Sequence, residues 1–99
     1  MATALNSYEA AGITAETAIF TAPTATEQVI LHLSVANVGA GDALINIKRN
    51  NVHFAKGVPV AVGGTFIGES KIAFKTGDTL KVSSDVAVDV LVSTGDVTP

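Results

Sequence analysis

The fold is set by Val86-Ala87-Val88-Asp89-Val90-Leu91-Val92-Ser93, in which valine returns at every second position. Successive side chains of a β-strand point to opposite faces, so this period of two places all four valines on one side. We expect the valines to meet a core and Asp89 to meet solvent. The run therefore predicts a half-buried β-strand.

Similar runs recur along the chain. The first spans Thr17 to Ala22, and the strongest spans Gln28 to Asn37. Alternation in the second run predicts one face made of Val29, Leu31, Leu33 and Val35 and an outward face made of Ile30, His32, Ser34 and Ala36. This run is the best candidate for a central strand.

Turn residues separate the later runs. Asn50-Asn51 lies between Ala43–Arg49 and Val52–Lys56, and asparagine tolerates the positive φ of a two-residue turn, so a hairpin is predicted. Pro59 cannot donate to a ladder, which predicts an extended connection at an edge or loop for residues 57–64. Further short strands are predicted at Thr65–Ile67, Lys71–Phe74, Thr79–Ser83 and Val86–Ser93, the last two pairing across Ser84-Asp85.

These runs define the fold class. Seven to eight short strands, with turns at roughly 8 to 12 residue intervals, indicate an all-β antiparallel β-sandwich, either Ig-like or jelly-roll. A chain of 99 residues can bury one modest core, so a single sandwich domain is predicted for residues 17–99. Its core is expected to include the four phenylalanines Phe20, Phe54, Phe66 and Phe74.

Residues 1–16 are small, polar and rich in alanine, with no clear period. They predict an N-terminal arm that is either flexible or docked on a neighbouring subunit, with Tyr8 and Ile13 as its anchors. His32 shares the predicted outward face with Ile30, which makes both candidates for a subunit contact. The candidate interface residues are therefore Tyr8, Ile13, Ile30 and His32.

The amino-acid composition narrows the range of functions to consider. The net charge of −3 and the pI near 5.1 give no electrostatic reason to bind nucleic acid or an anionic membrane. The chain has no cysteine, and neither a secretion signal nor a membrane span is expected from its hydropathy. A mean hydropathy of +0.44 suggests that another subunit covers part of the apolar surface.

No reactive constellation stands out. His32 and His53 lie on different predicted strands, whereas a zinc site draws three or more protein ligands together. The carboxylates Glu69, Asp78, Asp85, Asp89 and Asp96 are scattered through turns and outer faces, and Asp78 is expected to stabilise its own turn. We expect no enzyme, no catalytic residue, no metal and no cofactor.

The order of several segments resembles small virion structural proteins of tailed bacteriophages, including marine and cyanobacterial phages. The segments are Ala18-Ile19-Phe20-Thr21-Ala22-Pro23, Leu33-Ser34-Val35-Ala36-Asn37, Gly57-Val58-Pro59-Val60 and Thr76-Gly77-Asp78-Thr79-Leu80-Lys81-Val82. Each segment alone is mostly turn chemistry, and their succession carries the resemblance across most of Thr17 to Ser93.

The resemblance implies a non-enzymatic β-sandwich located on the virion, and in the host cytoplasm during assembly. The leading hypothesis is a capsid decoration or cement protein that binds the major capsid protein or other virion proteins as a homo-oligomer, with a trimer favoured. The alternatives are a neck, tail or baseplate component of the virion, or a module that binds a glycan or protein of the host surface.

Overall fold

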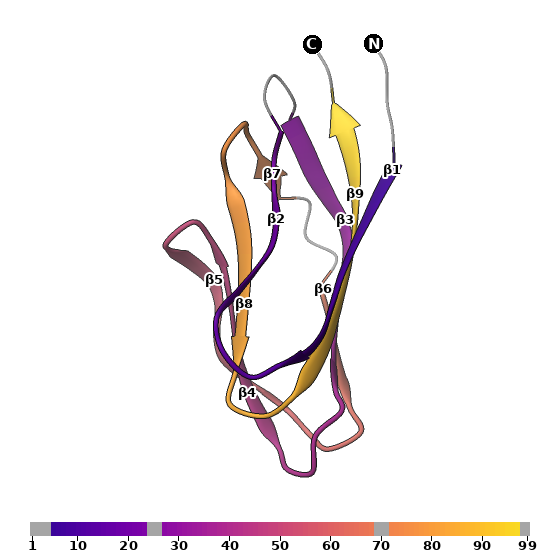
Figure 1. Cartoon of the computed structure of the whole chain (residues 1–99), viewed down its shortest axis with the longest axis vertical. Coiled ribbons are helices and arrows are strands. Elements are labelled where there is room, and N and C mark those ends of the chain that lie inside the picture. The colour runs from indigo at the N-terminus through magenta and orange to yellow at the C-terminus, as the bar shows by residue number, and fades with distance from the viewer. Residues whose placement is uncertain (1–4, 24–26, 69–71, 98–99) are drawn as a thin grey trace.

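The computed structural model describes residues 5–23, 27–68 and 72–97, which form nine β-strands in two antiparallel sheets (Figure 1). The strands are β1 (Leu5–Ile13), β2 (Thr17–Thr21), β3 (Glu27–Asn37), β4 (Ala43–Arg49), β5 (Val52–Val60), β6 (Thr65–Gly68), β7 (Ala73–Phe74), β8 (Thr79–Ser84) and β9 (Val88–Val97). The predicted antiparallel β-sandwich is confirmed. In this part of the chain no helix is long and apolar enough to cross a membrane.

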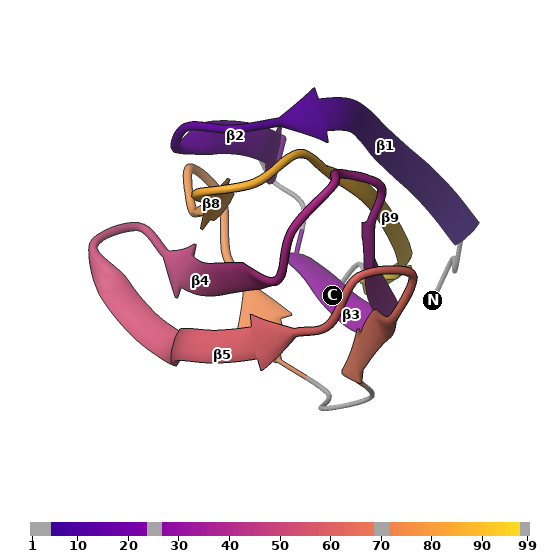
Figure 2. The ribbon, with the colours of Figure 1, turned by 90° about the horizontal axis from the view of Figure 1, so that it is seen from below.

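The strand order is that of a jelly roll. Sheet A has the order β1-β9-β3-β6, with β7 also paired to β3, and sheet B has the order β2-β8-β4-β5. β7 pairs with Gln28 and Val29 and β6 with residues 33–36, so together they occupy one strand position beside β3. The chain changes sheet at most connections, and the two layers face each other across the core (Figure 2).

β9 is the half-buried strand that the valine rhythm predicts, and it lies in the interior of sheet A. It pairs with β1 on one side and β3 on the other, which satisfies its backbone along both edges. Val88, Val90 and Val92 are buried and Asp89 is exposed, as expected. Across the core, sheet B contributes Ala43, Ile45, Ile47, Val60, Phe20, Leu80 and Val82 to the same cluster.

The predicted pairing of the last two strands is wrong. β8 pairs with β2 and β4 in sheet B, whereas β9 belongs to sheet A. Residues 85–87 therefore cross between the sheets. Asp85 accepts a hydrogen bond from the Leu44 backbone N–H at 2.8 Å, and the Ser84 hydroxyl donates to the Val86 carbonyl at 2.6 Å. These contacts stabilise the crossing, which lets both strands bury one face.

A β-bulge in β3 overturns the predicted faces of that strand. Ile30 pairs with Thr94 and His32 pairs with Ser93, so Leu31 is an extra residue opposite β9. Ile30 is consequently buried at 2% exposure, and Leu31 is 42% exposed. The predicted outward position of Ile30 and inward position of Leu31 are both wrong, because a single bulge switches the faces that a strict period of two assigns.

The predicted N-terminal arm is wrong for the residues that the structure describes; residues 1–4 lie outside them. β1 pairs with β9 within the same chain from Leu5 to Ile13. Ile13 is buried in the core, and the Tyr8 ring stacks on Phe20 with ring centroids 4.6 Å apart. The physical reason is the backbone edge of β9, which β1 hydrogen-bonds within the sandwich.

The asparagine hairpin is confirmed. Asn50 has φ of 56°, and Arg49 pairs with Val52 across the two-residue turn. β5 then continues through Pro59 to Val60, so the predicted connection over residues 57–64 begins as strand. Pro59 is tolerated because β5 is an edge strand of sheet B.

The four phenylalanines divide by position. Phe20 and Phe74 are in the core with ring centroids 5.1 Å apart, and Phe66 packs partly buried against it. Phe54 is 39% exposed on the edge strand β5, so its predicted core position is wrong.

We predict that Phe74→Ala lowers the free energy of unfolding by about 3 to 5 kcal/mol, because it leaves a cavity in a filled core. Phe54→Ala is the matched control, and its loss is expected to be clearly smaller because the ring is already partly hydrated. Urea unfolding followed by circular dichroism measures both, and equal losses would contradict the assigned burial.

Candidate subunit interface

The outer face of sheet A, called face A, combines exposed aliphatic side chains with small ones. A row of directly opposed residues runs across β6, β3, β9 and β1, formed by Ile67, Ser34, Leu91 and Glu9. Ile67 is 58% exposed and Leu91 is 44% exposed. Exposed aliphatic residues that flank small ones on the outer face of a sheet offer apolar area for a partner to cover.

A shallow depression lies within face A. Its lining is formed by Glu9, Ala10, Ala11, Ser34, Ala36, Asp89, Val90 and Leu91. Asp89 accepts a hydrogen bond at 2.9 Å from the backbone N–H of Gly12, where β1 bends at φ of 64°. The floor of the depression is formed by small apolar side chains, and the carboxylates of Glu9 and Asp89 give the depression negative charge.

The outer face of sheet B, called face B, has a different chemistry. Its central row is formed by Ala18, Lys81, Lys48 and His53. Lys48 makes a salt bridge of 2.7 Å to Glu16, and the hydrogen bond from Lys48 lowers the pKa of that carboxyl. Lys81 lies directly opposite Lys48, so two cations are neighbours on this face.

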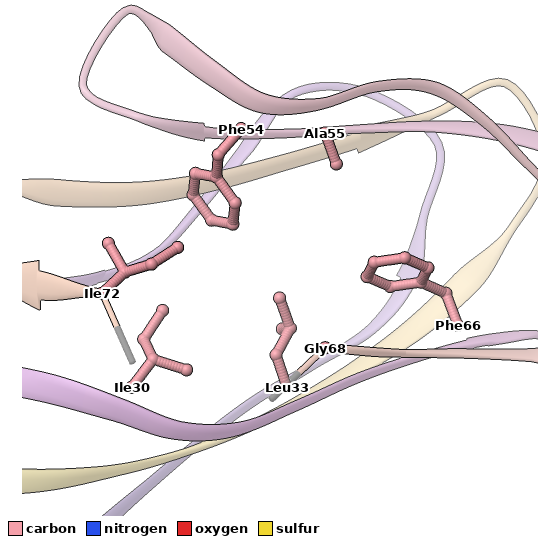
Figure 3. A pocket seen from close by; sticks show the side chains of 7 residues that line it. All are labelled: Ile30, Leu33, Phe54, Ala55, Phe66, Gly68 and Ile72. Carbon is pink, nitrogen blue, oxygen red and sulfur yellow. The ribbon is translucent and has the colours of Figure 1, made fainter. Parts of the chain in front are cut away.

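An apolar pocket opens between the sheets on the side where β5 faces β6 (Figure 3). It has a volume of about 80 Å³, and its lining is formed by Ile30, Leu33, Phe54, Ala55, Phe66, Gly68 and Ile72. Phe54 comes from β5 and Phe66 from β6, so the opening lies between the two edge strands. An apolar side chain fits this space, and the lining side chains supply no group for acid–base or nucleophilic chemistry.

Asn37 holds the loops together at the end of β3. Its buried side-chain amide donates to the carbonyls of Gly41 at 2.8 Å and Val60 at 3.0 Å, and its oxygen accepts from the Gly39 N–H at 2.9 Å. These bonds tie the β3–β4 loop to the end of β5. The loops carry exposed Val38 and Val62, which adds apolar surface at this tip.

Several ionisable groups serve local structure, and Asp78 is the clearest example. Within the described ranges, no group of three or more His, Asp or Glu side chains is placed to hold a metal ion. Asp78 accepts hydrogen bonds at 3.0 Å from the Asn50 side-chain amide and from the Lys75 backbone N–H. The predicted turn role of Asp78 is therefore confirmed. The hydrogen bond from Asn50 also ties this turn to the β4–β5 hairpin.

The structure separates the four predicted interface residues. Ile13 and Ile30 are in the core at 4% and 2% exposure, so their side chains offer no surface to a partner. Tyr8 is partly buried and accepts a hydrogen bond from the Gln28 amide at 2.9 Å, which anchors β1 to its own sandwich. His32 pairs with Ser93 on face A and is partly exposed.

Sequence reasoning missed the larger contributors to face A. Leu91 follows the alternation of β9, since its neighbours Val90 and Val92 are inward and it must point outward. That signal was present in the sequence. Ile67 and Leu31 gave no such signal, because a short strand and a bulge determine their directions.

Comparison with known proteins finds a solved structure of similar fold. No protein-family model matches this sequence, and no curated protein matches it either. Among solved structures, the chain is similar to one from the acidic stable capsid structure of Helicobacter pylori bacteriophage KHP30. The TM-score is 0.62 at 8% identity, and the match covers 97% of this chain and 87% of that chain. At this identity the likeness establishes a shared fold.

We predict that Asn37→Ala lowers the free energy of unfolding by at least about 2 kcal/mol, because it leaves two carbonyls and one N–H without their partner. Asn51→Ala, in the exposed hairpin turn, is the control and is expected to change little. Thermal and urea unfolding measure both variants, and an unaffected Asn37→Ala protein would refute the bracing role.

The pH dependence of stability follows from Asp78. Hydrogen bonds from Asn50 and from the Lys75 N–H lower its pKa below the ordinary value of 3.8. A carboxyl whose pKa is lower in the folded state stabilises the fold above the unfolded pKa and loses that contribution as pH falls through the folded value. We predict that the stability difference between the protein and Asp78→Asn is constant near neutral pH and shrinks below pH 3.8. Urea unfolding over a pH series tests this, and a difference that grows in acid would contradict it.

Proposed function

We propose that the protein is a structural component of a bacteriophage virion, most specifically a capsid decoration or cement protein. In this role many copies bind the major capsid protein or other virion proteins and stabilise the shell through subunit contacts. The protein would lie on the virion, and in the host cytoplasm during assembly. The proposal includes a homo-oligomer, with a trimer favoured, and assigns no catalytic role and no cofactor.

The observation that carries the proposal is the likeness in fold to a chain of the KHP30 capsid structure, which covers 97% of this chain. The strand order of this chain is that of a jelly roll, and the jelly roll is a recurrent architecture of viral capsid domains. The order of segments in the sequence, which resembles phage virion proteins, supports the same class independently.

The surfaces also support this role. Ile67, Leu91 and Leu31 expose aliphatic area on face A, and Val38 and Val62 do so at the loop tip. The mean hydropathy of +0.44 is consistent with such apolar surface, and exposed apolar patches of this kind mark sites that neighbouring subunits cover. Symmetry multiplies each modest contact over a whole particle.

We predict that the protein copurifies with particles of the phage that encodes it, at a copy number comparable with that of the shell protein. Quantitative mass spectrometry of purified particles measures the ratio, and cryo-electron microscopy locates the density. A copy number far below that of the shell protein would reassign the chain to the neck, tail or baseplate.

A binding experiment distinguishes the virion role from the alternative of a host-binding module. If particles lack the protein and the purified chain binds a glycan array or host cells, a receptor-binding module replaces the virion role. Stable incorporation in the shell without such binding supports decoration.

A further inference from the structure

The two sheets of the sandwich carry charges of opposite sign. In the described residues, the strands of sheet A contain the carboxylates Glu9, Glu27, Asp89 and Asp96 and no lysine or arginine. The strands of sheet B, over the same described ranges, contain Lys48, Arg49, Lys56 and Lys81 and no carboxylate. The jelly-roll topology thus sorts the acidic strands into one layer and the basic strands into the other. Asp96 and Arg49 do not belong to the outer faces, because Asp96 accepts a hydrogen bond from the buried Gln28 amide and Arg49 donates to the Ala73 carbonyl of sheet A.

Attraction between the two layers of one molecule does not account for this separation. The backbones of packed sheets are about 10 Å apart, and outward side chains of opposite sheets are further apart still. At physiological salt the Debye length is about 8 Å, so charges on opposite outer faces are largely screened from each other. The separation therefore contributes little to the folding of one copy.

Face B also carries an internal electrostatic cost. Lys81 and Lys48 are directly opposite each other, and like charges at such positions destabilise a sheet. Glu16 makes its salt bridge to Lys48 and is also near enough to Lys81 for that cation to contribute to its lowered pKa, whereas Lys81 makes no ion pair of its own among the described residues. A carboxylate from outside the chain would compensate Lys81.

Face A offers such a carboxylate. Glu9 is exposed at the end of the row that includes Leu91 and Ile67, and within the described residues its carboxylate makes no hydrogen bond or ion pair. It lines the shallow depression together with Asp89. Small side chains on the floor of this depression leave room for a long side chain of a partner.

We propose that face A of one copy docks on face B of a second copy, with Glu9 beside Lys81 across the contact. Leu91 and Ile67 on face A then cover the aliphatic stems of the lysines and exposed Leu44 on face B. The contact is heterologous, because each copy uses a different face toward each neighbour. Such contacts close into rings or continue as stacks, so assemblies grow beyond a dimer.

Charge complementarity favours a second copy of this chain as the partner of face A. Each face finds opposite charge on the other face of the same chain. This inference does not rest on the virion role, because it concerns the purified chain alone. Its failure would leave the copy-number test of the proposed function untouched.

The test uses charge reversal, with sedimentation velocity and native mass spectrometry as readouts. The unmodified protein is expected to form species larger than a dimer, more weakly as salt increases. Glu9→Lys and Lys81→Glu should each weaken association by at least about tenfold, since each places like charges together. Lys75→Glu makes the same charge change as Lys81→Glu at an exposed turn and should associate normally.

Two combinations identify the contact. The double variant Glu9→Lys/Lys81→Glu should regain association, because the pair is reversed and still complementary. An equimolar mixture of the two single variants should also associate, since each supplies a face that fits the other. Circular dichroism and thermal unfolding confirm that every variant is folded.

The opposite results are equally definite. A protein that stays monomeric at high concentration and low salt overturns the proposal, and so does a discrete dimer that grows no further. Normal association of a folded Lys81→Glu or Glu9→Lys variant excludes this contact, and failure of the double variant excludes the pairing of these two residues. Association only after shell protein is added would assign the faces to a different partner.

Discussion

The valine row of β9 holds the two layers of the sandwich together. Val88, Val90 and Val92 project from the interior strand of sheet A into a core shared with Ile45, Ile47 and Val82 of sheet B. Because β9 is hydrogen-bonded by both β1 and β3, those three strands form a continuous layer beneath the valines. Burying each valine contributes roughly 1.5 to 3 kcal/mol, and packing of the row requires both sheets at once.

This constraint explains why the N-terminal strand belongs to the sandwich. Without β1, the edge of β9 would be open beside the most apolar part of the core. β1 closes that edge, and Ile13 and Tyr8 fill the space beside it. The Tyr8 ring continues an aromatic stack through Phe20 to Phe74, so β1 is joined to the interior of its own chain. Although its sequence has no clear period, β1 is thus fixed in the sandwich by its pairing with β9.

The surfaces left over after folding have distinct chemistry. Face A is acidic and carries exposed aliphatic residues, face B is basic, and the side between β5 and β6 opens into a small apolar pocket. The edge strand β5 carries Lys56, Gly57 and Pro59, which discourage uncontrolled pairing of its free backbone. The proposed docking of face A on face B leaves that edge free. A protein with two unlike faces and a protected edge can build ordered contacts without aggregating through its strands.

Local chemistry was readable from the amino-acid order. The alternation of β9, the Asn50-Asn51 hairpin and the Asp78 turn all follow from the side-chain directions and φ preferences of neighbouring residues. The sheet to which each strand belongs was not readable, because β8 and β9 are adjacent in sequence yet lie in different layers. The bulge at Leu31 was hidden for a similar reason, since only the pairing with β9 reveals an extra residue. The candidate interface depended on the sheet assignment and on this bulge. The outward direction of His32 was therefore predicted correctly, whereas that of Ile30 was wrong. Separation of charge between the faces arises from long-range pairing, and tertiary structure alone decided it.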